Sequence, residues 1–333
     1  MMPLLFFAFL AVMFGSLGLG HYPVSSVEIL KILMTSELGT NHDPDDFPWI
    51  VIWMVRMPRI LMVAISGMGL SLVGVVMQGV FRNPLVGPEV LGVSSGAAFG
   101  GVLAIVLGWS SLPYMIVSAF IFGGGALIVA LIITRLAGHS GILGFILAGV
   151  IISAFFGALV GLAQYVADPN TQLAPIIFWL MGSFAAANFK NTAFLAAVIL
   201  IAGTPLVALS WRMNLLSLGE DDARSLGLNV NRLRLLVVIL ASLIVAGQVS
   251  VSGGVGWVGL IIPHLARMLV GPEHSRLMPV SALMGGIYLM LIDNLARSLT
   301  RQEIPISLLT AVLGAPVFVI LFVKLQNKGW VSD

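Results

Sequence analysis

The chain has 333 residues, of which 59% are hydrophobic and only 9% are charged, and its net charge at pH 7 is +2. Soluble domains carry about 25% charged residues, so this composition excludes a soluble domain and indicates an integral membrane protein. The absence of cysteine excludes disulfides, thiolate catalysis and thiolate metal sites. The basic residues are scattered beside apolar runs, which favours orientation in a bilayer over binding of nucleic acid.

Ten apolar segments follow one another along the chain. About 20 apolar residues cross the hydrocarbon core of a bilayer, so the length leaves room for ten spans and little else. The sequence therefore predicts an all-α, polytopic membrane protein with a single transmembrane domain over residues 1–333. The predicted spans are 3–20, 60–81, 90–107, 113–136, one beginning at 141, 192–209, one ending near 249, a short irregular one within 252–267, 277–296 and 305–323.

In the N-terminal third of the chain, apolar runs alternate with short polar segments. No Lys or Arg precedes residues 3–20, so this run lacks the basic region of a cleaved signal peptide and is interpreted as the first span. An acidic loop with the sequence NHDPDDFPW follows, and then Arg56 and Arg59 stand at the mouth of the second span. After that span, Pro84 and Pro88 forbid a continuous helix and predict a stiff turn.

The fifth span carries small residues at every fourth position: Gly149, Ser153, Gly157 and Gly161. One stripe of this helix therefore lacks bulk, and another backbone or a cargo can come close to it. The pattern leaves helix packing and lining of a pathway both open. Residues 173–184 are apolar but too short to span, which indicates a re-entrant or interfacial segment.

The most distinctive polar stretch is SLGEDDARSLG, residues 217–227. Ser217 and Glu220 have the spacing of a capping box, acids fill the first turn, and Gly227 can close the helix in a left-handed conformation. The sequence thus predicts one capped helix. Its apolar residues at helical spacing are Leu216, Gly219, Ala223 and Leu226. This face favours docking into a groove on another protein, and an ordinary solvated loop helix is the alternative.

Alternating the ten predicted spans across a membrane separates the basic residues unequally. One side receives Arg82, Arg135, Arg212, Arg224, Arg232, Arg234, Arg267, Arg276, Lys324 and Lys328, and the other receives Lys31, Arg56, Arg59, Lys190, Arg297 and Arg301. The positive-inside rule then predicts that both termini and the polar helix are cytoplasmic.

The chain lacks the motifs of an ATPase or a metalloprotease. It contains neither G-x-x-x-x-G-K-[ST] nor H-E-x-x-H, so we expect no catalytic residue, no metal site and no cofactor in it. His264 is interpreted as a capping or interface residue, and Asp293 as the local partner of Arg297 one turn later. A self-sufficient ion-coupled transporter is the main alternative, but it would need more buried ionisable groups.

Four separated motifs resemble the FecCD family, the membrane subunits of ABC importers for iron chelates, haem and cobalamin, with molybdate or tungstate relatives. They are NPLVGPEVLGVSSGA at 83–97, GEDDARSLGL at 219–228, GLIIPHLAR at 259–267 and LGAPVF at 313–318. The resemblance implies an inner-membrane homodimer that works by alternating access. It also implies two cytoplasmic ATPases that bind ATP and Mg, and a periplasmic or lipid-anchored binding protein.

The resemblance also implies roles for particular residues. The coupling helix, about 217–228, would contact the ATPase through Gly219, Glu220, Asp221, Ala223, Leu226 and Gly227. The cytoplasmic gate would be Asn83, Pro84 and Leu85 with His139 and Ser140, and the pathway would be lined by Gly149, Ser153, Gly157 and Gly161. The binding protein would dock on Arg56, Arg59, Arg297 and Arg301. For these arginines, anchoring at lipid headgroups is the alternative.

Overall fold

The computed structural model describes residues 1–35, 47–109, 111–136 and 142–326, and every regular element within these ranges is a helix. The all-α prediction is therefore confirmed. In chain order the helices are α1 (Met2–Gly18), α2 (Ser26–Thr35), α3 (Phe47–Ile50), the π-helix η1 (Val51–Arg56), α4 (Met57–Phe81), the 3₁₀-helix η2 (Pro88–Leu91), α5 (Val93–Val106), α6 (Leu112–Leu136), α7 (Ile142–Val166), α8 (Leu173–Met181), α9 (Phe189–Ala208), α10 (Ser210–Ser217), α11 (Glu220–Ser225), α12 (Val230–Ser252), α13 (Val258–Val270), α14 (His274–Ser298) and α15 (Ile306–Gln326).

Six helical segments are long and apolar enough to cross a membrane, and four shorter apolar helices accompany them in the described part of the chain. The six are 47–81, α6, α7, α9, α12 and α14, and the four are α1, α5, α13 and the first part of α15. The second span begins earlier than its predicted start at residue 60. The helix extends back to Phe47 because Trp49 and Ile52 are buried in the same apolar cluster as α1 and α2.

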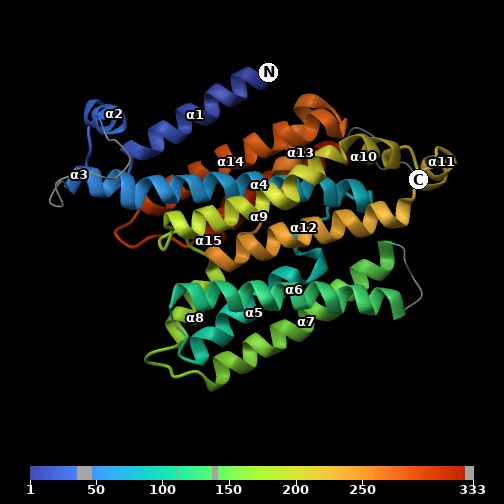
Figure 1. The fold of residues 1–333 in the computed structure, drawn as a ribbon, viewed down its shortest axis with the longest axis horizontal. Coiled ribbons are helices and arrows are strands. Elements are labelled where there is room, and N and C mark those ends of the chain that lie inside the picture. Colours follow the sequence, from blue (N-terminus) through green and yellow to red (C-terminus); the bar gives the residue numbers. More distant parts are fainter. Residues whose placement is uncertain (36–46, 110, 137–141, 327–333) are drawn as a thin grey trace.

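Helix α4 runs through the middle of the bundle, against α14, α12, α13 and α9 (Figure 1). Its side chains are apolar or small on nearly every side, as expected for a helix that is buried all round. The contact with α14 is close enough that a Cβ at Gly67 would lie 2.2 Å from the carbonyl oxygen of Gly285. Small residues thus hold the two central helices backbone to backbone.

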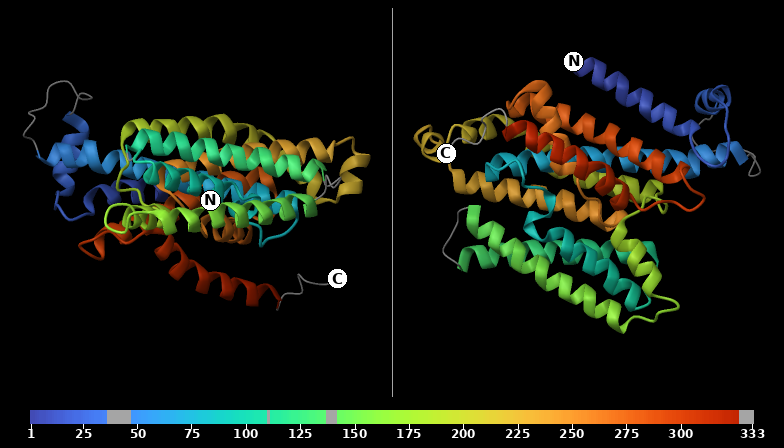
Figure 2. Two further views of the ribbon diagram at one scale, coloured as in Figure 1. Left: turned by 90° about the horizontal axis from the view of Figure 1, so that it is seen from below. Right: turned by 180° about the vertical axis from the view of Figure 1, so that it is seen from behind.

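Helices α5, α6 and α7 form a second group beside this centre, and α7 lies at its outer edge (Figure 1). Helix α15 diverges from the bundle, as the left view of Figure 2 shows. Its residues Leu308, Val312 and Val317 are exposed. Both α7 and α15 therefore present apolar side chains at the surface of the subunit.

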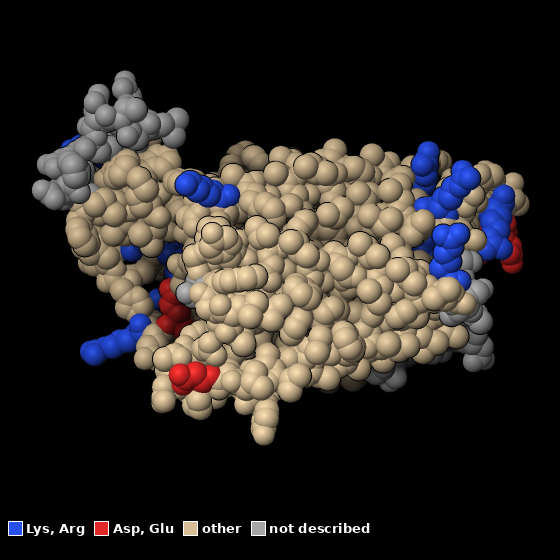
Figure 3. Space-filling model, turned by 60° about the horizontal axis from the view of Figure 1, so that its bottom comes forward, with Lys and Arg blue, Asp and Glu red and all other residues tan. Residues whose placement is uncertain are grey.

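The long helices run between two polar ends. Helices α2 and α3 lie at one end, and α10 and α11 lie at the other (Figure 1). In the space-filling view, Lys, Arg, Asp and Glu gather at these ends and leave a wide uncharged belt between them (Figure 3). Such a belt matches the hydrocarbon core of a bilayer, where an unpaired charge is costly.

Candidate functional site

The polar stretch is a corner of two short helices. Ser217 ends α10, and its hydroxyl donates to the carbonyl oxygen of Asn214 at 2.6 Å. Helix α11 starts only at Glu220, after Gly219 with φ of 132°, and no side chain caps it. The prediction of one helix with a capping box is therefore wrong, because the break at Leu218 and Gly219 separates Ser217 from the helix that it was expected to cap.

The end of α11 agrees with the prediction. Gly227 has φ of 83°, and its N–H donates to the carbonyl oxygen of Arg224 at 2.9 Å. The next N–H, that of Leu228, donates to Ala223 at 3.0 Å. These two bonds form a Schellman motif, in which the left-handed glycine satisfies the last carbonyls of the helix.

The predicted apolar face of this corner is divided between two environments. Leu216 and Ala223 are fully buried in the core of their own chain, whereas Leu226 is 60% exposed. The corner therefore has no continuous apolar face toward a partner. Ala223 packs into the core of this chain and anchors the six-residue helix α11 there. The surface left for a partner is acidic and includes exposed Asp221.

A buried arginine connects this corner to the next long helix. The Arg234 side chain on α12 is 1% exposed and forms an ion pair with Glu220, the first residue of α11. Glu220 also accepts a hydrogen bond from Arg224 at 3.2 Å. In the sequence Arg234 is only one of the charges that orient the chain, and nothing in the local pattern distinguishes it from its exposed neighbour Arg232.

The predicted stiff turn follows α4. Arg82 ends the helix with φ of 49°, and the side chain of Asn83 accepts a hydrogen bond from the N–H of Leu85 at 2.8 Å. Asn83, Pro84 and Leu85 are all exposed, so the gate residues predicted here project from the surface of the subunit. The other two, His139 and Ser140, lie outside the described residues.

After this turn the chain re-enters the bundle as η2. A Cβ at Gly149 of α7 would lie 1.8 Å from the carbonyl oxygen of Val90, and one at Gly259 of α13 would lie 2.5 Å from Pro88. Two glycines therefore make room for η2 between α7 and α13. For Gly149, the packing interpretation of the small-residue stripe is correct.

The rest of the stripe is open in the single subunit. Nothing lies within 4 Å of a Cβ built on Gly157 or Gly161, and both glycines are exposed, while Ser153 is half-buried. Glu89 of η2, which the sequence analysis did not single out, is also exposed. Desolvation by the surrounding protein nevertheless raises the pKa of Glu89 above its ordinary value.

At the opposite end, three of the four predicted docking arginines form a buried cluster. Arg59 pairs with Asp293 at 2.8 Å and with Glu303 at 2.5 Å, and Arg297 lies 3.7 Å from Asp293. Arg56 donates to the carbonyl oxygens of Leu17 and Tyr22, and Arg297 donates to that of Ser16. We call Arg56, Arg59, Arg297, Asp293 and Glu303 the arginine cluster.

The arginine cluster corrects the expectation that these arginines face outward. Arg56, Arg59 and Arg297 are 4–6% exposed, and only Arg301 is exposed. A guanidinium at the mouth of a span must be paired when it is desolvated, and the acids and carbonyls of the neighbouring segments supply that pairing. The predicted pair of Asp293 with Arg297 is present, but Asp293 lies closer to Arg59.

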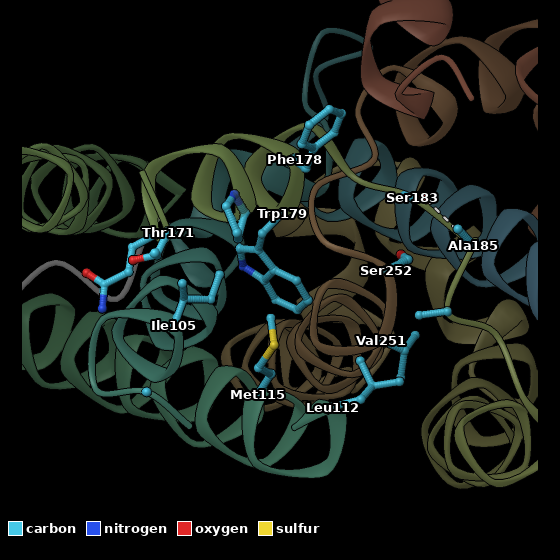
Figure 4. Close-up of a pocket in the computed structure, with 14 residues that line it drawn as sticks. Ile105, Leu112, Met115, Thr171, Phe178, Trp179, Ser183, Ala185, Val251 and Ser252 are labelled. Carbon is cyan, nitrogen blue, oxygen red and sulfur yellow. Dashed lines mark hydrogen bonds between the residues drawn. The ribbon is translucent and has the colours of Figure 1, made fainter. Parts of the chain in front are cut away.

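Helix α8, in the segment predicted to be re-entrant or interfacial, has nine residues and forms one wall of a pocket of about 460 Å³. Trp179 projects among Ile105 of α5, Met115 of α6 and Ser252 of α12 (Figure 4). Its ring N–H donates to the carbonyl oxygen of Ala98 at 3.2 Å. The pocket is largely apolar, and within the described residues no group of three His, Asp or Glu side chains could hold a metal ion.

Comparison with known proteins identifies this arrangement. The model of the FecCD transport family matches residues 7–324. The chain belongs to the FecCD transport family. It is 48% identical to the molybdate import system permease protein MolB of Haemophilus influenzae, over 94% of this chain and 92% of that protein. It is 36% identical to the hemin transport system permease protein HmuU of Yersinia pestis, over 98% and 97% of the two chains.

A solved structure extends the likeness to three dimensions. The fold matches that of a metal-chelate type ABC transporter in an inward-facing conformation, with a TM-score of 0.87 and 45% identity over 97% of this chain and 98% of that one. This FecCD protein is thus the membrane-spanning permease subunit of an ABC importer, a multi-pass protein of the inner membrane. It is not itself an enzyme, since in this family the permease is the transmembrane subunit and ATP is hydrolysed by a separate ATPase.

Proposed function

We propose that two copies of this chain enclose the path of an importer that moves a metal-containing substrate into the cytoplasm by alternating access. The substrate class is an iron chelate, haem, cobalamin or a molybdate-like oxyanion. The observation that carries this proposal is the likeness of the whole chain to permeases of those substrates, with 48% identity to a molybdate permease. Two ATPase subunits that bind ATP and Mg would power the cycle, and a periplasmic or lipid-anchored binding protein would deliver the substrate.

The second copy would meet this one along α7. Gly157 and Gly161 leave a bare stripe on a surface that also exposes Val150 at 60% and Phe155 at 59%. Small residues on an apolar helix surface allow close approach of another transmembrane helix. We therefore place the path beside Ser153, Gly157 and Gly161, with Gly149 behind it as a packing residue.

The ATPase would dock on the corner formed by α10 and α11. Asp221 and Leu226 are exposed there, and the charged side chains of this end lie outside the uncharged belt. The unequal distribution of Lys and Arg supports a cytoplasmic position for this end and for both termini. Asn83, Pro84 and Leu85 follow the C-terminal end of α4, the helix that α10 contacts. They would close the path there as its cytoplasmic gate.

The binding protein would dock at the opposite end, over the arginine cluster. Arg301 is exposed and would contact an acidic patch directly, while Arg56, Arg59 and Arg297 contribute positive charge from beneath. Direct contact with Arg59 would require Glu303 to leave it, because Glu303 occupies both Nη atoms of that guanidinium. The proposed seat is therefore one exposed arginine above three buried ones.

The experiment is uptake into proteoliposomes that contain the permease, its ATPase and, outside, its binding protein. Molybdate, a ferric siderophore, haem and cobalamin are offered outside in turn. The lumen, which the ATPase faces, is loaded with or without ATP. We expect uptake of one substrate class that requires ATP and both partners. Uptake that proceeds without the ATPase, driven by an ion gradient, would contradict the proposal.

A further inference from the structure

The structure assigns Arg234 as the residue that holds α11 against α12, so that displacement of α11 moves the transmembrane helix with it. Arg234 would act through Glu220 and would not touch the ATPase or the substrate. This inference rests on the proposed docking of the ATPase on α11. Arg234 is thus a positioning residue for that function.

The burial of Arg234 makes this bond important to the position of α11. With 1% exposure, Arg234 is among the largest fully buried side chains of the described residues. A guanidinium at such a site keeps its charge, so a carboxylate and other acceptors must compensate it. Glu220, which is 30% exposed, supplies that carboxylate from the first residue of α11.

Helix α11 has few other contacts that could determine its position. It contains six residues, and helices this short are not stable by themselves in water. Its N-terminus has no side-chain cap, and Ala223 is its one buried residue. The Schellman motif fixes its C-terminal end, and the ion pair of Glu220 with Arg234 connects its N-terminal end to α12.

Helix α12 reaches from this ion pair to the other end of the bundle. There Ser252 accepts a hydrogen bond from the N–H of Ser183 at 2.8 Å, and Ile306 donates to Gly182 at 3.1 Å. A Cβ at Gly182 would lie 2.1 Å from the carbonyl oxygen of Gly254, so these turns touch backbone to backbone. A shift of α12 would therefore reach the segment after α8 and the start of α15.

Arg224 provides a matched control on the same acid. It donates to Glu220 at 3.2 Å, but its side chain is 53% exposed and it belongs to α11 itself. An exposed pair within one helix contributes little, and it cannot connect α11 to α12. Replacing Arg224 removes an ion pair of Glu220 within α11, whereas replacing Arg234 removes the ion pair between α11 and α12. Comparing the two variants therefore shows whether the connection between the helices matters.

The experiment uses the full complex of permease, ATPase and binding protein in proteoliposomes, with cobalamin, haem, a ferric siderophore and molybdate offered as probes. The readout is the number of ATP molecules hydrolysed per substrate transported, together with retention of the ATPase on the permease. We expect Arg234→Met to raise this ratio about tenfold or more while the ATPase stays bound. Arg224→Met should change it by less than about twofold, and Glu220→Gln combined with Arg234→Met should be no worse than Arg234→Met alone.

A thiol cross-link separates position from folding. The chain has no cysteine, so Glu220→Cys with Arg234→Cys gives one defined pair for a short bifunctional thiol reagent. We expect the unlinked variant to be uncoupled and the linked one to regain coupling, which a role in folding alone would not produce. Failure of the linked variant to recover, or equal effects of Arg234→Met and Arg224→Met, overturns the inference.

One further variant distinguishes this inference from the proposed function. Asp221→Lys changes the exposed surface of α11 without touching Arg234. If it releases the ATPase while Arg234→Met leaves coupling intact, only the inference fails. If Asp221→Lys and Leu226→Lys both leave the ATPase bound, α11 is not its docking site and both statements fail.

Discussion

Arginine side chains are buried at both ends of the bundle, but they are held in different ways. In the arginine cluster, Arg59 and Arg297 pair with two acids, and Arg56 and Arg297 donate to the carbonyl oxygens of three further residues. At the α11 corner, Arg234 meets the acid of one short helix. The arginine cluster joins several segments of the chain to one another, whereas the pair of Glu220 with Arg234 joins α11 to α12 and allows these two to move as a unit. The arginine cluster is therefore suited to a rigid docking surface, which we call the rigid seat, and the α11 corner to a segment that moves.

The largest expected effect lies in the arginine cluster. Asp293→Ala removes the carboxylate shared by Arg59 and Arg297 and leaves buried charge without compensation, which should lower the free energy of unfolding by about 3–5 kcal/mol. Denaturant unfolding of the detergent-solubilised subunit measures this change. Glu273→Ala, which breaks an exposed pair with Arg276, is the control and should change it by less than about 1 kcal/mol. Equal effects of the two variants would contradict a rigid seat.

A second comparison separates two glycines of the α7 stripe. Gly149→Val places side-chain atoms against the carbonyl of Val90 and should destabilise the subunit by about 1–3 kcal/mol. At Gly157 a Cβ has no atom of another segment within 4 Å, so Gly157→Val should disturb the unfolding of the subunit much less but should reduce uptake. Unfolding and uptake are measured on the same preparations. If Gly157→Val leaves both unchanged, the open part of the stripe faces lipid.

A smaller effect is expected at Glu303. Its side chain is 36% exposed and occupies Arg59, where an acidic residue of the binding protein would otherwise sit. Glu303→Gln should therefore tighten capture of the binding protein by about twofold to fivefold, the range of a partly exposed ion pair. Titration at two salt concentrations measures this, and the gain should shrink in high salt.

Arg301→Gln serves as the opposite control for Glu303, since loss of the exposed positive charge should weaken capture. Weaker capture by Glu303→Gln as well would mean that Glu303 supports the seat and does not compete for it. Capture that responds to neither variant nor to salt would favour anchoring of these arginines at lipid headgroups.

The smallest effect concerns pH. Because the pKa of Glu89 is raised in the folded subunit, the folded state binds its proton more tightly than the unfolded state, and stability contributed by that proton is lost as pH rises through the folded pKa. Glu89→Gln has no carboxyl to titrate at this position, so its stability does not fall in this way as pH rises. The unfolding temperature of the unmodified subunit should therefore fall relative to that of Glu89→Gln between low and neutral pH. A constant difference across this range would mean that Glu89 titrates normally.

Composition and local pattern were enough for the class of protein. Apolar runs of span length are a property of the chain alone, because the bilayer sets the length and no tertiary contact is needed to recognise it. The turn at Pro84 and the end of α11 at Gly227 were predictable for the same reason, since proline and left-handed glycine restrict the backbone at their own positions. The four family motifs are likewise sequence properties.

The tertiary structure decided which charges are free and which are buried. Arg56, Arg59 and Arg301 look alike in the sequence, yet Asp293 and Glu303 lie more than 200 residues away from Arg59 and bury it. Gly149 and Gly157 also share one pattern, and only the entry of η2 beside Gly149 separates their roles. Burial depends on segments distant in the chain, so the local pattern that predicts a helix cannot say which side of it meets protein, substrate or lipid.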